Sequence, residues 1–136
     1  MIIKSVKLGK RAWTVEIPLA PVPASRPRVG RWGTYYLKTY ANWKAAAEEY
    51  LSGFKDEDPV STSLRVTMDV WCKRPQKMTR DYPRPDVDNF AKAALDAVTK
   101  AQCVWKDDDQ VVHLRVKKAY SKEGVPPSTT LIIEEL

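Results

Sequence analysis

The sequence predicts a small single domain of the α+β (mixed α/β) class, in which two helices pack on a mixed sheet of about four strands. Length is the first observation behind this prediction, because 136 residues suffice for one well-formed hydrophobic core but not for two. Periodicity is the second, because segments of strand-like alternation are interleaved with segments of helical spacing. We therefore expect residues 1–136 to form one domain.

The first half of the chain predicts one strand, one loop and one helix. Residues 12–19 alternate between apolar and polar side chains and contain β-branched residues, as strands do. Residues 20–38 are rich in proline, glycine and arginine, which favours an extended and exposed loop. Residues 39–54 carry apolar side chains at helical spacing and end near Gly53, so they predict a helix.

The second half predicts a strand, a loop, a helix and two further strands. Residues 63–73 alternate strictly and place five apolar side chains on one face, whereas the Pro- and Arg-rich residues 74–85 form a second loop. Residues 88–101 have an alanine-rich apolar face, which predicts a helix buried against the sheet. Residues 110–120 and 128–136 predict the last two strands, the first with Val112, Leu114 and Val116 on one face.

The charge of the chain is basic and unevenly distributed. The formal net charge is +6, and residues 1–40 hold eight basic residues against one acidic residue. Such a basic region favours a polyanionic partner, most often nucleic acid, although a solvated basic face without a partner would look the same. No apolar run is long enough for a membrane span or a signal peptide, so the expected location is the cytoplasm, without a membrane partner.

Two acidic clusters stand out in this basic chain. Asp86 and Asp88 lie at the start of the second predicted helix, and residues 107–109 are three consecutive aspartates. If the chain stays extended as far as Asp88, both side chains point the same way. Asp88, Lys92 and Asp96 then follow one stripe of the helix. The structural alternatives are helix capping for the pair, a solvated turn for residues 107–109 and a salt bridge for Lys92.

These residue types suit metal-assisted chemistry on a phosphodiester. Mg²⁺ prefers oxygen ligands from a few carboxylates and waters, and it can neutralise charge and activate a water. A lysine beside such a site could stabilise the phosphate as it reacts. The single histidine lies in a predicted strand and supports no histidine base, and no phosphate-binding glycine motif predicts a nucleotide cofactor.

The stretch "RPDVDNFAKAALDAV" followed by "VWKDDDQVVHLRVKK" resembles the RusA family of Holliday junction resolvases. The resemblance extends over most of the chain, including "IPLAPVPASRPR" and "YANWK". It implies a RusA-like fold and a homodimeric crossover junction endodeoxyribonuclease that requires Mg²⁺, with Mn²⁺ as a substitute. Such enzymes bind four-way or other branched DNA and nick it in pairs during DNA recombination and repair, in a phage, a prophage or a host cell.

The resemblance also implies the site residues. The family's metal-binding and catalytic aspartates match Asp86 and Asp88 and one residue of the later block, where the alignment of Trp105 and Gln110 selects Asp108. Its neighbours Asp107 and Asp109 stay open as additional acidic candidates, because three aspartates in a row blur the register. The family's catalytic lysine matches Lys92.

Two basic loops are expected to bind the DNA phosphates. Their cationic residues are Arg26, Arg28, Arg31, Lys73, Arg74, Lys77, Arg80 and Arg84. Trp32, Tyr35 and Tyr36 could stack on unpaired bases, but packing in the core or in a dimer interface is the favoured interpretation. The functional alternatives are a broader nuclease acting on flaps and other branched DNA, and a protein that binds branched DNA without cutting it.

Overall fold

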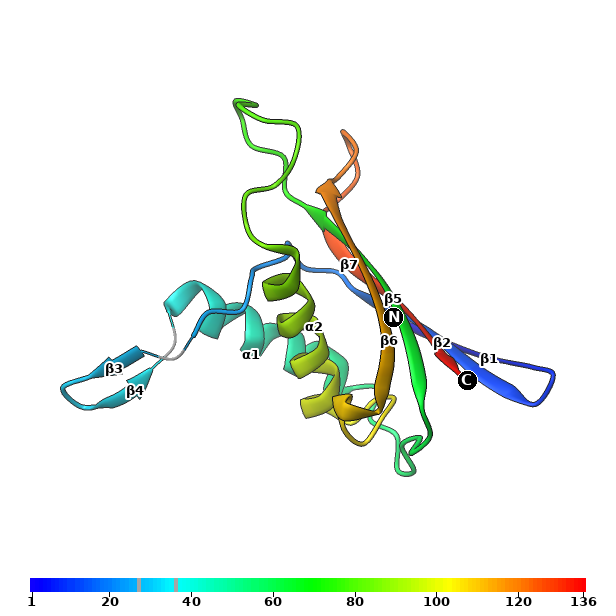
Figure 1. The fold of residues 1–136 in the computed structure, drawn as a ribbon. Helices are drawn as coiled ribbons and strands as arrows, with labels where there is room; N and C mark the ends of the chain where they lie inside the picture. Colours follow the sequence, from blue (N-terminus) through cyan, green and yellow to red (C-terminus); the bar gives the residue numbers. More distant parts are fainter. Residues whose placement is uncertain (27, 36) are drawn as a thin grey trace.

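The protein is a five-stranded mixed sheet with both helices on one face (Figure 1). The computed structural model describes residues 1–26, 28–35 and 37–136, and only the backbone of residues 28, 34 and 35. The strand order is β1-β2-β7-β5-β6, and only β5 and β6 pair in parallel. The predicted α+β class is confirmed, with five strands in the sheet where about four were expected.

The additional strand is β1 (Ile2–Lys7), which pairs with β2 (Lys10–Ile17). The two are joined by a turn at Leu8 and Gly9, both at positive φ, 55° and 77°. Gly9 adopts such a φ without strain, which suits a tight hairpin. The sequence does not predict β1 because nearly all of its side chains are exposed, so no apolar alternation marks it.

The core lies between the helices and the central strands. The buried side chains form one hydrophobic cluster that takes in every second residue of β5 (Leu64–Cys72). β5 pairs with β6 (Val111–Tyr120) on one side and β7 (Ser128–Glu135) on the other. The predicted burial of this strand's apolar face is confirmed.

The two helices are α1 (Lys38–Ser52) and α2 (Val87–Ala101). The buried face of α2 consists mostly of alanines, which lets its backbone approach both α1 and the sheet closely. Both helices were predicted to within two residues at each end. Each spans 15 residues, and no helix in the described part of the chain could cross a bilayer.

The expectation for the apolar face of residues 110–120 is wrong in part. Val112 is 63% exposed and Leu114 is 41% exposed. The register with β5 shifts between Leu64 and Arg65, so Val112 lies in an irregularity of the ladder and loses its alternation. β6 is also one of the two edge strands of this sheet, and α2 leaves part of its helix-facing side uncovered.

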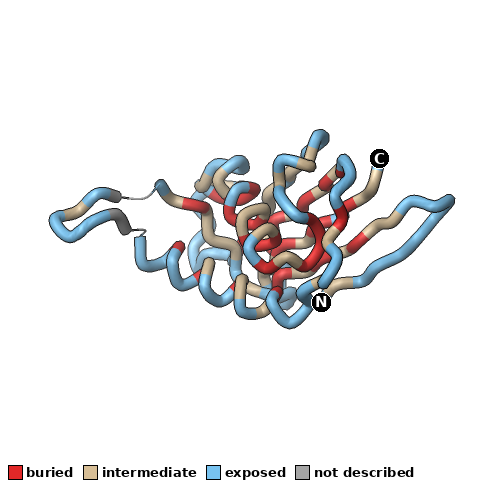
Figure 2. Tube along the Cα trace, turned by 90° about the horizontal axis from the view of Figure 1, so that it is seen from below, coloured by how far each residue is buried: buried red, intermediate tan, exposed pale blue. Residues whose placement is uncertain are grey.

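The expected loop at residues 20–38 contains a separate hairpin. Strands β3 (Arg28–Gly30) and β4 (Gly33–Tyr35) pair with each other and project away from the core (Figures 1 and 2). Trp32 at its tip is 92% exposed, so packing in the core of this chain is excluded for it. The side chains of Arg28 and Tyr35, and all of Tyr36, lie outside the described residues.

Candidate active site

α2 begins immediately after the Pro- and Arg-rich segment. Asp86 is its N-cap residue, with extended φ and ψ of −66° and 140°, and its exposed carboxylate makes no capping hydrogen bond. The helix starts at Val87, so the chain does not stay extended as far as Asp88, which sits in the first turn. The two carboxylates therefore do not share one direction as an extended segment would require. Because the Asp86 side chain makes no capping hydrogen bond, helix capping does not explain why an aspartate is present there.

Lys118 fixes the approach of the chain to this helix. Its Nζ atom donates hydrogen bonds to the carbonyl oxygens of Pro83, at 2.9 Å, and Pro85, at 2.6 Å. Neither proline can donate through its own nitrogen, so an external donor is a natural way to satisfy and orient this stretch. A residue of β6 thereby sets the position of the peptide that leads directly into Asp86.

Asp88 opens onto a cavity of about 600 Å³ between α2 and β6, called here the α2–β6 cavity. Its polar lining consists of Asp88, Lys92 and Asp96, one turn apart on α2, together with Asp108. Apolar side chains of both elements, Leu114 among them, complete the wall. Among the described residues Lys92 forms no ion pair, so the salt bridge considered from the sequence is not made.

Asp108 is the half-buried member of the acidic turn. Burial raises the pKa of its carboxyl above the usual range, and the nearby charges of Asp96 and Asp107 raise it further, against a smaller opposing contact with Thr99. Carboxylates that repel one another in this way would be relieved by a cation. Asp96 was not assigned to the site from the sequence, although its spacing from Asp88 and Lys92 placed it on the same stripe.

The other two aspartates of the turn lie outside the α2–β6 cavity. Asp107 caps the short 3₁₀ helix η1 (Asp108–Gln110), and its side chain accepts a hydrogen bond from the Asp109 nitrogen at 3.4 Å. Asp109 is exposed, and neither residue lines the α2–β6 cavity. Of the three consecutive aspartates, only Asp108 shares a cavity with Asp88 and Lys92.

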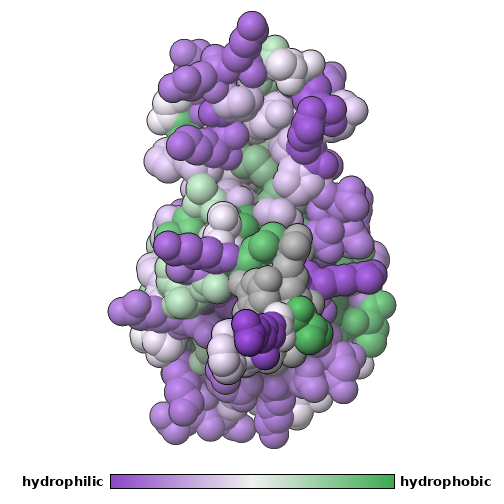
Figure 3. All heavy atoms as spheres, turned by 90° about the vertical axis from the view of Figure 1, so that its left-hand side faces the viewer, coloured by the Kyte–Doolittle hydropathy of each residue, from purple (hydrophilic) through white to green (hydrophobic). Residues whose placement is uncertain are grey.

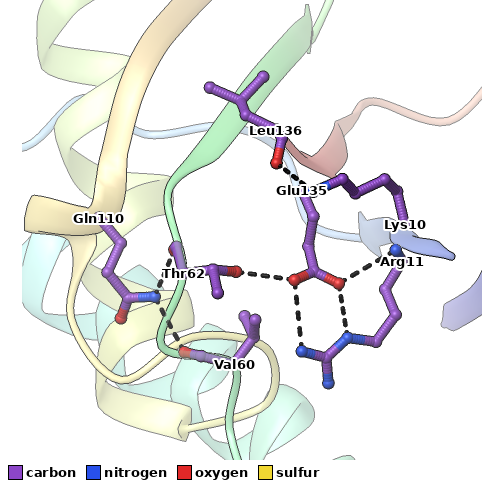
Figure 4. A network of polar contacts seen from close by, with 7 residues as sticks. All are labelled: Lys10, Arg11, Val60, Thr62, Gln110, Glu135 and Leu136. Atoms are coloured by element: carbon purple, nitrogen blue, oxygen red, sulfur yellow. Dashed lines mark hydrogen bonds and ion pairs between the residues drawn. The ribbon is translucent and has the colours of Figure 1, made fainter.

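Gln110 holds this turn in place (Figure 4). Its Oε1 atom accepts hydrogen bonds from the nitrogens of Lys106, at 3.0 Å, and Asp107, at 2.9 Å. Its Nε2 atom donates to the carbonyl oxygens of Val60, at 2.9 Å, and Thr62, at 3.0 Å. All four hydrogen-bonding positions of the amide are thus satisfied, and the turn that carries Asp108 is tied to the segment before β5.

Asp86 lines a different cavity, of about 420 Å³, on the other side of the start of α2. Asn89 and Ser25 line it too, and the buried Ser25 hydroxyl has no hydrogen-bond partner within the described ranges. No three acidic, histidine or cysteine side chains in the described chain are close enough together to hold a metal ion. The structure thus brings Asp88, Lys92 and Asp108 together and keeps Asp86 at the adjoining edge.

The expected DNA-binding residues fall into two groups. Arg26 and Arg31 are exposed near the β3–β4 hairpin, and the Arg31 guanidinium lies over the Trp32 ring at 5.5 Å. The second group belongs to the 73–86 loop, which forms the lobe at the top of Figure 1 and is mostly hydrophilic in Figure 3. Arg74 donates to the Ser121 carbonyl oxygen at 3.1 Å, so part of its hydrogen-bonding capacity serves the fold.

The charge of Asp108 should cost stability in the absence of a cation. Because folding raises its pKa, the folded state is stabilised when the carboxyl is protonated and weakened as rising pH ionises it. We expect Asp108→Asn to raise the melting temperature in EDTA at neutral pH, whereas Mg²⁺ should raise it in the wild type only. Thermal unfolding measures both effects. A lower melting temperature of the variant in EDTA would contradict the inference that Asp96 and Asp107 repel the Asp108 carboxylate.

Glu135 closes the network behind Gln110 (Figure 4). Its carboxylate pairs with the Arg11 guanidinium at 2.6 Å and accepts from the Thr62 hydroxyl at 2.7 Å. Arg11, and then Thr62, lower the pKa of this carboxyl to about 2 from 4.5. The resulting stability is present above about pH 4.5 and is lost as the pH falls toward 2.

We therefore expect Glu135→Gln to be less stable than the wild type at pH 7 and to lose less stability on acidification. Urea unfolding between pH 7 and pH 3, about the range of this titration, measures the difference. The matched control is Glu123→Gln, at an exposed residue of the β6–β7 turn. Equal acid sensitivity of wild type and Glu135→Gln would contradict the role of the Arg11 contact.

The structure is an α+β domain with a cavity lined by carboxylates and a lysine, and comparison with known proteins shows the family to which this domain belongs. The family model described as Endodeoxyribonuclease RusA matches residues 18–133. The chain belongs to this RusA family.

Two kinds of relative support the assignment. YqaN of Bacillus subtilis (strain 168) is 39% identical over 135 residues, which cover 85% of this chain and 91% of YqaN. The crossover junction endodeoxyribonuclease RusA of Escherichia coli (strain K12) is 40% identical over 65 residues, and its counterpart from Enterobacteria phage 82 is 38% identical over 65. These two alignments cover 48% of this chain and 49% of each relative, about half of either length.

Proposed function

We propose that this protein is a Mg²⁺-dependent endodeoxyribonuclease that cuts four-way DNA junctions by paired nicks in DNA recombination and repair. The observation that carries the proposal is the α2–β6 cavity, which is lined by Asp88, Asp96 and Asp108 together with Lys92, and none of these four forms an ion pair in the described chain. Membership in an endodeoxyribonuclease family supports the same conclusion.

The carboxylates of the α2–β6 cavity offer the oxygen ligands that a hard divalent cation prefers. Burial raises the pKa of Asp108, and the charges of Asp96 and Asp107 raise it further, so a divalent cation beside these carboxylates would relieve their mutual repulsion. Asp86, whose carboxylate makes no capping bond, offers oxygen ligands at the adjoining edge. We assign Asp86, Asp88 and Asp108 as the holders of Mg²⁺, which would have to draw these side chains together on binding, since no three acidic side chains of the described chain are close enough to hold it as they stand. The ion would supply charge neutralisation and an activated water.

The remaining roles belong to side chains of this chain. Lys92, exposed on α2 between Asp88 and Asp96, would stabilise negative charge on the phosphate that is attacked. The cations of the 73–86 loop would hold the DNA backbone, which positions the substrate without reading its sequence. Their contribution should weaken strongly as salt is added.

The junction as substrate, and a homodimer as the active form, are the finer parts of the proposal. The relatives from Escherichia coli and phage 82 bear the name crossover junction endodeoxyribonuclease. A dimer with a two-fold axis would present two identical sites to a junction of similar symmetry, so the two nicks could be paired.

The test is a cleavage assay that compares a synthetic four-way junction, a flap and a linear duplex of the same sequence. Each substrate is incubated with Mg²⁺, with Mn²⁺ and with EDTA, and the mass of the free protein is measured by light scattering. Symmetric nicks in the junction alone, lost in EDTA, are expected. Equal cutting of the flap would replace the proposal with a broader branched-DNA nuclease, and binding without cutting under any metal would replace it with a binding protein.

A further inference from the structure

A third cavity adjoins the one that contains Asp86, on the side of the 73–86 loop. It has a volume of about 340 Å³ and is bounded by the segment after β2, the ends of β5 and β6, and the loop itself. This volume falls within the range of about 300–1,000 Å³ that is usual for small-molecule sites. The name Pro-Arg pocket is used for it here, after the lining residues Pro21, Pro83, Tyr120, Lys77, Arg80 and Arg84.

The Pro-Arg pocket is lined by apolar residues and by cations. Five prolines, Tyr120 and the buried Phe90 form the apolar part of its lining, and their rings are flat. Four cations, Lys73 among them, also belong to this lining, and no acidic residue lines the pocket. In the described chain none of these cations takes part in an ion pair. Flat apolar walls accept a base, and unpaired cations accept a phosphate.

The walls are held in place by β6 rather than left to a mobile loop. The Tyr120 hydroxyl donates to the Tyr82 carbonyl oxygen at 3.0 Å, and Lys118 holds the carbonyls of Pro83 and Pro85. The Arg80 guanidinium lies over the Tyr82 ring at 5.3 Å. A pocket formed before the ligand arrives costs little ordering on binding.

The Pro-Arg pocket lies next to the cavity that contains the Asp86 carboxylate. Arg84 and Pro85 line both the Pro-Arg pocket and the cavity that contains Asp86. A strand whose phosphate lies at Asp86 would therefore pass over Arg84, and its next nucleotide would reach the pocket. Only a nucleotide released from its base pair could enter, because a paired base is held in the stack.

We propose that the Pro-Arg pocket binds one unpaired nucleotide of the DNA, with its base against the proline and Tyr120 walls and its phosphate among Lys77, Arg80 and Arg84. The inference rests on the proposed function for the source of that nucleotide, a branch point where pairing is interrupted. It adds a binding step in which the enzyme captures a base beside the phosphate to be cut.

The first arm of the test needs neither a junction nor a metal. The 5′-monophosphate of 2-aminopurine deoxyriboside is titrated in EDTA and followed by its fluorescence. The double variant Lys77→Ala/Arg80→Ala removes two cations of the pocket, and Lys122→Ala removes an exposed cation of the adjoining β6–β7 turn, outside the pocket. We expect binding about tenfold weaker in the double variant, from the loss of charge-assisted hydrogen bonds, and unchanged in the control.

The second arm places 2-aminopurine at each position beside the crossover of a four-way junction. Binding of the wild type in EDTA should raise the fluorescence at one position, because a base that leaves the stack loses quenching by its neighbours, and the double variant should abolish the rise. No rise at any position, or an equal effect of Lys122→Ala, would overturn the pocket. If inorganic phosphate displaced the fluorescent mononucleotide as effectively as an unlabelled nucleotide does, the pocket would be only an anion site, and the proposal would be overturned as well.

The two arms separate the pocket from the proposed function. If the mononucleotide binds as expected but the junction is neither bound nor cut, the pocket stands and the function proposed above fails. If the junction is cut with Mg²⁺ but both arms are negative, the function stands and the pocket is wrong.

Discussion

Replacement of Asp88 by asparagine should abolish cleavage of a four-way junction while junction binding stays intact or becomes tighter. The asparagine side chain would keep the size of the aspartate but remove one negative oxygen ligand from the α2–β6 cavity, so the site would hold Mg²⁺ poorly. The rate should fall by roughly 10²–10³-fold or more, as for other losses of electrostatic stabilisation at a reacting phosphate or carbonyl. Binding should not fall, because removing a negative charge near the DNA backbone reduces repulsion.

The measurements are single-turnover cleavage in Mg²⁺ and a binding titration in EDTA. The matched control is Asp81→Asn, which removes an exposed carboxylate of the 73–86 loop that lines none of the cavities described above. The control should bind and cut like the wild type. Parallel loss of binding and cleavage in Asp88→Asn would show that Asp88 serves the fold or the DNA interface rather than the reaction.

Replacement of Lys118 by methionine should have the second largest effect, although Lys118 lines neither of the cavities that contain the proposed metal ligands. Methionine keeps the length of the side chain but removes the donor that holds the carbonyls of Pro83 and Pro85. The peptide that leads into Asp86 would then be free to shift. A misplacement on the order of 1 Å can cost about 10²-fold in rate, and we expect a loss of that size.

The readout that separates positioning from simple loss of charge is the Mg²⁺ concentration at half-maximal cleavage, which should rise in Lys118→Met. Lys117→Met is the matched control, because Lys117 is exposed on the same strand and lies 3.9 Å from the Asp69 carboxylate at the sheet surface. It loses the same charge without touching the loop. Equal effects of the two variants on the Mg²⁺ requirement would contradict the positioning role of Lys118.

Much of the fold could be predicted because strong periodicity coincides with burial. The alternation from Leu64 to Cys72 and the alanine-rich face of α2 are both core surfaces, so burial requires an apolar pattern in each. β1 and the β3–β4 hairpin bury little, and nothing selects an apolar pattern there. The exposed face of β6 was misjudged because strand order and the register shift decide its burial, and neither can be read from local sequence.

The site could be predicted only where a motif carried it. The positions of Asp88, Lys92 and Asp108 follow from a short helix and a short turn, and the fold brings them to one cavity. The contacts by which Lys118 and Gln110 bind distant segments were not predicted, since those partners are backbone carbonyls about 30 to 50 residues away in sequence, whereas the local capping box of Asp107 and Gln110 has a readable spacing and was overlooked. Such distant contacts leave no spacing pattern. The spacing of Asp96 from Asp88 and Lys92 placed it on the same stripe of the helix. A solvated helix with no functional site shows the same spacing, so this pattern alone did not assign Asp96 to the site.

The place of β7 in the sheet has a consequence for how this activity arises. β7 lies between β2 and β5, so the β1–β2 hairpin joins the rest of the sheet only through a strand formed by the last part of the sequence. Glu135 on that strand contacts both Arg11 and Thr62, and Thr62 in turn meets Gln110 and the turn of Asp108. Contacts so distant along the chain form late and slow the folding of a domain. During synthesis, the turn that carries Asp108 therefore gains its full support only after β7 has been made.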